Sequence, residues 1–89
     1  MTGLLIKRPE RFVETDIDDE VVVMDLSNGN FFSLKETALE IWRLVDGTRN
    51  RAALLTVLAA EYAVAEADIS GDVDAFLDQV QGAGLVEAQ

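Results

Sequence analysis

Apolar and polar positions change their period near residue 35 of this chain, and the change separates predicted strands from predicted helices. Residues 20–26 are rich in β-branched and apolar side chains, residues 27–30 are polar, and residues 31–34 are again mostly apolar, which predicts a β-hairpin. Asn28 and Gly29 favour a type I′ turn, in which both residues take positive φ angles. Residues 11–15 predict an earlier strand, and residues 17–19 predict the turn into the hairpin.

The first predicted helix covers residues 35–46. Ser33 and Glu36 have the spacing of a capping box, and Gly47 is placed to end the helix in a left-handed conformation. One face of this helix is apolar and consists of Ala38, Ile41, Trp42 and Val45. The same stripe predicts that Trp42 packs in the core.

Two further helices follow. Asn50 is a predicted N-cap for a helix that ends near Ala63, and a last helix covers residues 67–81 although Gly71 costs it about 1 kcal/mol relative to alanine. Gly82 and Gly84 are expected to end that helix before Leu85 and Val86. The apolar faces consist of Leu54, Leu55, Leu58 and Tyr62 in one helix and of Ile69, Val73, Phe76, Leu77 and Val80 in the other. Tyr62 is expected to cover the core with its hydroxyl in water.

This order predicts one α+β domain over residues 1–89, in which a small antiparallel sheet precedes a bundle of three helices. The length suits a single hydrophobic core. The last hairpin strand is expected at an edge of the sheet.

Composition narrows the function. With 7 basic and 17 acidic residues the net charge is −10, which should repel nucleic acid. No apolar run is long enough to cross a bilayer or to act as a signal-peptide core, so we expect a cytoplasmic protein. Cysteine and histidine are absent, so the sequence predicts a protein that is not an enzyme and that binds no metal or cofactor. Catalysis by carboxylates alone stays chemically possible, but it needs a cleft that so small a domain seldom encloses.

A family resemblance is carried by the order and spacing of several segments, namely Glu20-Val21-Val22-Val23-Met24-Asp25-Leu26, Asn28-Gly29, Phe31-Phe32-Ser33-Leu34, Ile41-Trp42-Arg43-Leu44-Val45-Asp46-Gly47, Asp72-Val73-Asp74-Ala75-Phe76-Leu77 and Gly84-Leu85-Val86. Over residues 9–87 the chain resembles PqqD-like proteins. It departs from their pattern at Lys35, where an asparagine is frequent, and at Asp19, where a turn glycine is common.

The resemblance implies a winged-helix RiPP recognition element, which binds the leader segment of a ribosomally made precursor peptide and does no chemistry itself. Its implied partners are that peptide and a modifying enzyme, such as a radical enzyme or a leader peptidase. The leader is implied to add a strand to the third strand and to lie between that strand and the third helix. Carried onto this chain, the implied binding residues are Asn30, Phe31, Phe32, Ser33 and Leu34 with Asp68, Asp72, Ala75, Phe76 and Gln79.

Neighbouring residues on a strand point to opposite faces, so one of Phe31 and Phe32 should face the core while the other is available to the groove. The sequence leaves open which. Asp68, Asp72 and Asp74 suit the positive end of a helix dipole, and the same row can attract a basic peptide. A row spaced along a helix does not supply the converging ligands of a metal site.

Three other functions are compatible with a small acidic domain to different degrees. A generic acidic protein-interaction adaptor remains open. A winged-helix transcription regulator needs a basic reading helix, whereas the helix here is acidic. A carrier domain modified on Ser70 is disfavoured by the hairpin and by the surrounding sequence, which lacks an Asp-Ser-Leu arrangement. The modification pathway and the leader sequence stay open.

Overall fold

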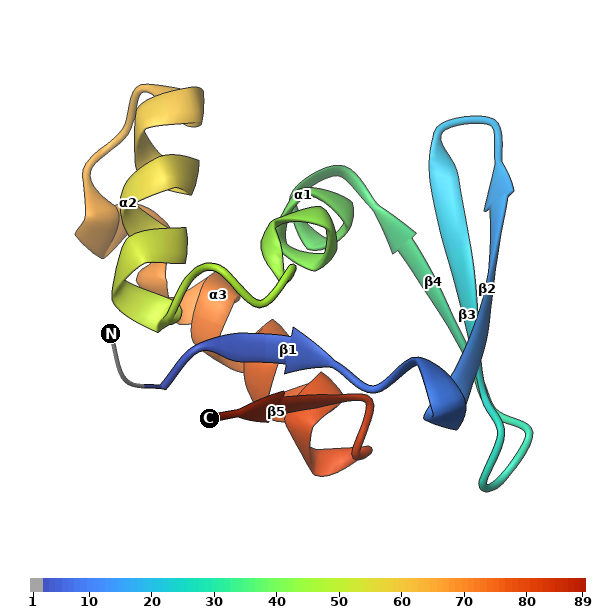
Figure 1. Cartoon of the computed structure of the whole chain (residues 1–89). Helices are drawn as coiled ribbons and strands as arrows, with labels where there is room; N and C mark the ends of the chain where they lie inside the picture. The colour runs from blue at the N-terminus through green and yellow to red at the C-terminus, as the bar shows by residue number, and fades with distance from the viewer. Residues whose placement is uncertain (1–2) are drawn as a thin grey trace.

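The computed structural model describes residues 3–89 and confirms an α+β architecture. A three-stranded antiparallel sheet precedes three helices, and a two-stranded sheet joins the two ends of the chain. In Figure 1 α1 lies between the larger sheet and α2, and α3 runs below α1 toward the small sheet. In chain order the elements are β1 (Leu5–Lys7), a 3-10 turn (Pro9–Arg11), β2 (Phe12–Ile17), β3 (Glu20–Asp25), β4 (Phe31–Lys35), α1 (Glu36–Leu44), α2 (Arg51–Tyr62), α3 (Glu66–Gly82) and β5 (Val86–Ala88).

The larger sheet has the order β2-β3-β4. The strand predicted at residues 11–15 is β2, which extends to Ile17 and pairs there with Glu20. Asp18 and Asp19 form the turn between them, and Asp18 takes a φ of 52°. An aspartate tolerates that left-handed conformation better than most residues do. The β2–β3 hairpin projects from the body of the molecule (Figure 1).

The β3–β4 connection corrects the predicted type I′ turn. Of its two central residues only Gly29 has a positive φ, 74°, so the type I′ geometry is absent. Residues 26–30 form a longer loop, which the buried Asp25 carboxylate organises by accepting from the Ser27 N–H at 2.9 Å and from its hydroxyl at 2.7 Å. These bonds, the Ser27 hydroxyl first, hold the pKa of Asp25 below its ordinary value.

The ends of α1 differ from the prediction. The Ser33 hydroxyl does not cap the helix; it donates to the Glu20 carboxylate at 2.6 Å, across the sheet. Lys35 occupies the N-cap position without a side-chain hydrogen bond. The helix stops at Leu44, and Gly47 takes its left-handed φ of 87° in the following loop.

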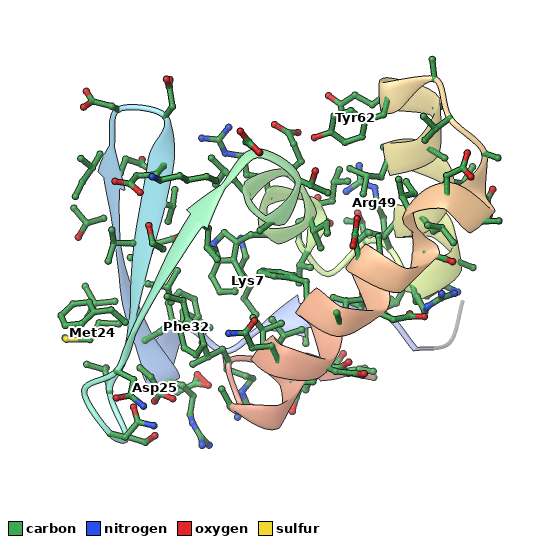
Figure 2. The ribbon with its side chains drawn as sticks, turned by 180° about the vertical axis from the view of Figure 1, so that it is seen from behind. Lys7, Met24, Asp25, Phe32, Arg49 and Tyr62 are labelled. Carbon is green, nitrogen blue, oxygen red and sulfur yellow. The ribbon has the colours of Figure 1, made fainter. Side chains whose placement is uncertain are left out.

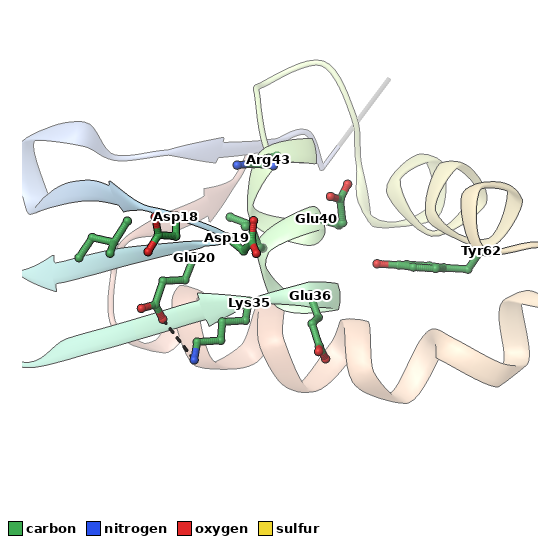
Figure 3. Close-up of a pocket in the computed structure, with 10 residues that line it drawn as sticks. Asp18, Asp19, Glu20, Lys35, Glu36, Glu40, Arg43 and Tyr62 are labelled. Atoms are coloured by element: carbon green, nitrogen blue, oxygen red, sulfur yellow. Dashed lines mark ion pairs between the residues drawn. The ribbon is translucent and has the colours of Figure 1, made fainter.

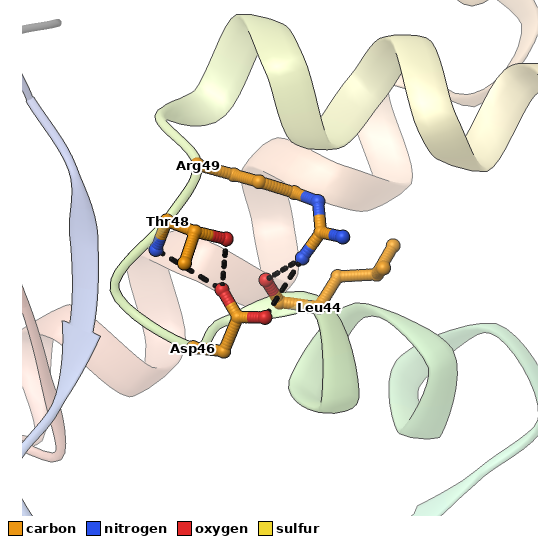
Figure 4. A network of polar contacts seen from close by, with 4 residues as sticks. All are labelled: Leu44, Asp46, Thr48 and Arg49. Atoms are coloured by element: carbon orange, nitrogen blue, oxygen red, sulfur yellow. Dashed lines mark hydrogen bonds and ion pairs between the residues drawn. The ribbon is translucent and has the colours of Figure 1, made fainter.

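That loop is fixed by a small polar network between α1 and α2 (Figure 4). Asp46 accepts from the Thr48 N–H at 3.0 Å, and Arg49 donates to Asp46 at 3.0 Å and to the Leu44 carbonyl at 3.2 Å. The Leu5 N–H donates to the Arg49 carbonyl at 2.8 Å, which ties the loop to β1. The start of α2 is thereby held against the small sheet.

The second and third helices match their predictions closely. The Asn50 side chain caps α2 by accepting from the Ala53 N–H at 2.9 Å, and Ala63 ends the helix in a left-handed conformation. The last helix includes Gly82, so Gly84, with a φ of 78°, is the glycine that reverses the chain. Tyr62 is 40% exposed, whereas the other members of its predicted stripe are buried.

One core is shared by the sheets and the helices. Trp42 is 1% exposed at its centre, which confirms its predicted burial. Burying each large apolar side chain contributes about 1.5–3 kcal/mol, so the shared core is the main reason that these short elements hold together. The most completely buried side chains are Trp42, Ile41, Leu54, Leu58, Leu85, Val23, Val45, Val73, Val80 and Val86.

Candidate peptide-binding edge

The strand β4 lies at an edge of its sheet, and two hydrogen bonds fix which of its backbone groups face outward. The Asp25 N–H donates to the Asn30 carbonyl on the β4 side, whereas the Leu26 N–H donates to the Arg11 carbonyl on the β2 side. Bonded and non-bonded pairs alternate along an antiparallel ladder. Phe32 and Leu34 therefore pair with β3, while the backbone groups of Phe31, Ser33 and Lys35 point toward the free edge.

The inner face of β4 is apolar. Leu34 is buried at 4% exposed, and the half-buried Phe32 packs against the same core as Phe76 of α3, which is 8% exposed. Figure 2 shows this side of the molecule, with β4 and α3 both toward the viewer and Phe32 labelled on the strand. Phe31 lies on the opposite face and is 68% exposed. Of the two phenylalanines, Phe32 is thus the one on the helix side of the sheet.

The remaining predicted residues lie around this edge. Asn30 is exposed at the end of the loop, where its N–H donates to the Asn28 side chain at 2.9 Å. On α3 the predicted residues other than Phe76 are exposed, namely Asp68, Asp72, Ala75 and Gln79. Asp74 differs from them because it forms an ion pair with Arg51 of α2, and it is therefore engaged within the fold.

Lys35 is an edge residue that the sequence analysis missed, because it was assigned to the helix. Its position two residues after Ser33 puts its N–H on the same outward edge as those of Ser33 and Phe31. Its side chain lies 3.5 Å from the Glu20 carboxylate. Extending the two-residue period of the strand by one more step would have identified it.

The other edge of the sheet, on β2, is less suited to an apolar strand. Its inner face carries Glu14 and Asp16, which are exposed carboxylates. Charged side chains pointing inward at an edge are a common protection against unwanted strand pairing. On the inner face the two edges are therefore chemically distinct, because there β4 carries apolar side chains and β2 carries carboxylates, whereas the outer face of β2 also exposes Val13 and Ile17.

A hollow of about 650 Å³ lies beyond the end of β4, between the β2–β3 turn, α1 and Tyr62 (Figure 3). A carboxylic acid that donates protons near neutral pH needs a raised pKa, whereas the Ser33 hydroxyl and the Lys35 charge lower the pKa of Glu20. Glu20 is therefore not tuned to act as a general acid near neutral pH. The lining of the hollow consists of Ile17, Asp18, Asp19, Glu20, Lys35, Glu36, Leu39, Glu40, Arg43 and Tyr62.

Residues 3–89 contain no cluster of three or more histidine, cysteine, aspartate or glutamate side chains suited to a metal ion. Within the same residues, no helix combines the length and the apolar character needed to cross a membrane.

Comparisons with known proteins find a similar solved structure and a matching family model. The chain is similar to a solved structure described as TbiB1 in complex with the TbiA(beta) leader peptide, with 29% sequence identity and a TM-score of 0.77 over 92% of this chain and 95% of that one. The comparison with curated proteins finds no match. The family model described as coenzyme PQQ synthesis protein D (PqqD) matches residues 20–86, which is most of the chain. The chain therefore belongs to the PqqD family.

Proposed function

We propose that this protein binds the leader segment of a ribosomally synthesised precursor peptide as an additional strand on β4 and presents the peptide to a separate modifying enzyme. The observation that carries the proposal is the outward-facing backbone of Phe31, Ser33 and Lys35 beside an apolar inner face. An unpaired edge gives affinity through main-chain hydrogen bonds, and that affinity does not depend on the peptide sequence.

Specificity comes from alternate side chains of the added strand. A peptide residue beside Phe32 points toward α3, because neighbouring strands share the same pleat. That peptide residue contacts Phe32 and the exposed face of α3. On α3, Asp72 lies about one turn before Phe76 and Gln79 about one turn after it. This surface suits a leader with apolar residues at alternate positions and a basic residue nearby.

The similarity to TbiB1 supports the proposal, since that protein is described in complex with a leader peptide. The family model matches residues 20–86, which include both β4 and α3. The chemistry of modification is assigned to the partner, a radical enzyme or a leader peptidase, because this chain has neither cysteine nor histidine. No cofactor is assigned to the domain.

A titration followed by nuclear magnetic resonance tests the proposal. The isotope-labelled protein is mixed with a synthetic leader peptide. We expect amide shifts and slower hydrogen exchange at Phe31, Ser33 and Lys35, together with shifts on the face of α3 around Phe76. Shifts confined to α2, with β4 unchanged, would show that the strand-addition mechanism is wrong.

A generic adaptor that binds folded proteins is the second candidate, and the same titration separates it because such a protein would ignore isolated leader peptides. A DNA-binding regulator is disfavoured, since α3 carries five acidic residues, Glu66, Asp68, Asp72, Asp74 and Asp78, and no basic one. With a net charge of −10, binding of duplex DNA should be undetectable at micromolar concentrations and physiological salt. A mobility-shift titration measures that directly.

A further inference from the structure

The outer face of the sheet carries a row of apolar side chains that ends abruptly at β4. Val13 pairs in register with Met24, and Met24 pairs with Phe31. Met24 is half-buried between its two neighbours, whereas Phe31 has a neighbour on one side only and is 68% exposed. We call Val13, Met24 and Phe31 the outer row. Its open end lies at the edge where the proposed peptide strand would add.

We infer that Phe31 is a specificity-determining residue which selects an apolar side chain of the bound peptide on the outer face, so that the peptide is read on both faces of the sheet. The inference rests on the proposed strand addition. A strand added to β4 places one residue beside Phe31, and that residue points to the same face as Phe31. Its two chain neighbours point inward, toward Phe32 and α3.

The outer face of β4 becomes polar after Phe31, so the expected preference for an apolar peptide residue applies only to the position beside Phe31. The next outward side chain is Ser33, whose hydroxyl donates to Glu20 at 2.6 Å. Beyond it Lys35 lies 3.5 Å from the same carboxylate. Polar peptide residues are therefore compatible with the positions beside Ser33 and Lys35, and the apolar requirement is restricted to the position beside Phe31.

A peptide fits the open end of the row better than a second copy of this chain does. Two copies that paired β4 to β4 would bring together domains that each carry a net charge of −10, and like charges oppose such an association. A short peptide brings little charge of its own, and it supplies both the backbone partners that the edge lacks and the side chain that the row lacks. The open end of the row is therefore filled by an apolar residue of the bound peptide.

The size of the effect follows from known cross-strand pairs. An aromatic residue paired with an apolar one contributes about 0.2–1 kcal/mol relative to alanine. Loss of the pair should therefore weaken binding by about 1.4- to fivefold. A change of this size sets a preference among peptides that the β4 edge already binds.

A selection from random peptides tests the inference without a known leader. A library of random-sequence peptides displayed on their own messenger RNA is selected against the wild-type protein and against Phe31→Thr. We expect wild-type selection to yield peptides in which apolar residues alternate along the chain and face the inner side of the sheet. One further residue, between two of these, should also be apolar and should face the outer side beside Phe31. Selection against Phe31→Thr should lose only that further position.

Affinities of two selected peptides then isolate the pair. One peptide keeps its apolar residue at the outer position, and the other carries threonine there. Phe31→Thr should weaken the first by about 1.4- to fivefold and leave the second unchanged. Val13→Thr is the matched control, because Val13 is also exposed, at 48%, but lies two strands away from the edge, and it should change neither affinity.

The outcomes separate the inference from the proposed function. If peptides bind at β4 but Phe31→Thr weakens neither of them, or weakens both equally, the inference is wrong and strand addition stands. If no peptide is enriched, both fail. If the wild-type protein dimerises in sedimentation experiments and Phe31→Thr abolishes the dimer, the outer row belongs to a second copy and the inference is overturned.

Discussion

Trp42 donates a hydrogen bond of 2.8 Å from its indole nitrogen to the carboxylate of Glu14, a residue 28 positions earlier in the chain. The ring of Trp42 also packs edge-on against Phe12, with a centroid distance of 5.1 Å, and the Lys7 ammonium lies 4.5 Å from the ring centroid. Burial lowers the pKa of Lys7, while the Glu14 charge acts in the opposite direction. Glu14 therefore stabilises both an indole N–H and a nearby cation, and it joins β2 to α1.

Glu14→Ala should destabilise the fold, because it leaves the N–H of a buried indole without its partner. The expected loss is about 1–3 kcal/mol in the free energy of unfolding, and Glu14→Gln should lose less because it keeps an oxygen acceptor. Urea unfolding followed by the fluorescence of the single tryptophan measures it. Asp16→Ala is the control, because Asp16 is an exposed carboxylate on the same strand and face. Equal effects of the two alanine changes would contradict the role given to Glu14.

Two glycine substitutions should have effects of opposite sign. Gly71 lies within α3, and a methyl group there would meet nothing within 4 Å, so Gly71→Ala should stabilise the protein by about 0.5–1 kcal/mol. Gly84 has a φ of 78°, and its added carbon would lie 2.9 Å from the Arg11 guanidinium. The guanidinium can move but the backbone strain remains, so Gly84→Ala should cost about 1 kcal/mol or more. Thermal unfolding of both variants checks the signs.

The Asp25 carboxylate should make a pH-dependent contribution to stability. Its folded pKa lies below the ordinary value of 3.8, first because of the Ser27 hydroxyl and then because of the Ser27 N–H. A depressed folded pKa means that the contribution is full above the unfolded pKa and is lost as the pH falls through the folded one. The advantage of the wild type over Asp25→Asn should thus shrink below about pH 4. Melting temperatures across a pH series measure this, and a constant difference would contradict it.

The sequence predicted those elements whose signal is local. The apolar stripes of α2 and α3 and the Asn50 cap were found because a helix buries one face and satisfies its own first turn. The β1–β5 pair was missed. Each strand has only three residues and its partner lies at the other end of the chain, so neither has a local pattern. The capping role of Ser33 was wrong for a related reason, since Glu20 on the neighbouring strand accepts its hydroxyl.

At the candidate edge, too, the sequence predicted what depends on neighbouring residues and missed what depends on residues elsewhere in the chain. The alternation of residues 31–34 predicted that Phe31 and Phe32 lie on opposite faces, but not which one faces α3. The loop over residues 26–30 decides it, because its length sets the register of β4 on β3. That loop depends on the buried Asp25, whose contacts with Ser27 no periodic pattern indicates.

The acidic row on α3 should favour peptides with a basic residue. Asp72 is exposed, so Asp72→Asn should weaken such a peptide by less than about 1 kcal/mol and leave an alanine-substituted peptide unchanged. Added salt should reduce the difference. Asp74→Asn is the comparison, because Asp74 is already paired with Arg51 and should affect peptide binding less. Calorimetric titrations at two salt concentrations measure both, and equal losses for the two peptides would count against a role for the Asp72 charge.

Replacing Ser33 by proline should block strand addition most directly. The register turns the Ser33 N–H toward the free edge, so proline removes a donor that an added strand needs without breaking a hydrogen bond to β3. Binding of a leader peptide should fall by at least about tenfold. The peptide loses its hydrogen bond from the N–H of residue 33, and the proline ring also occupies the space where the peptide backbone would lie closest to β4. Ser33→Ala separates this effect from the loss of the hydroxyl, because it removes the bond to Glu20 but keeps the N–H. Circular dichroism and melting temperatures confirm that both variants are folded. If Ser33→Pro is folded and binds the leader as tightly as Ser33→Ala does, the peptide does not pair with β4 at this residue.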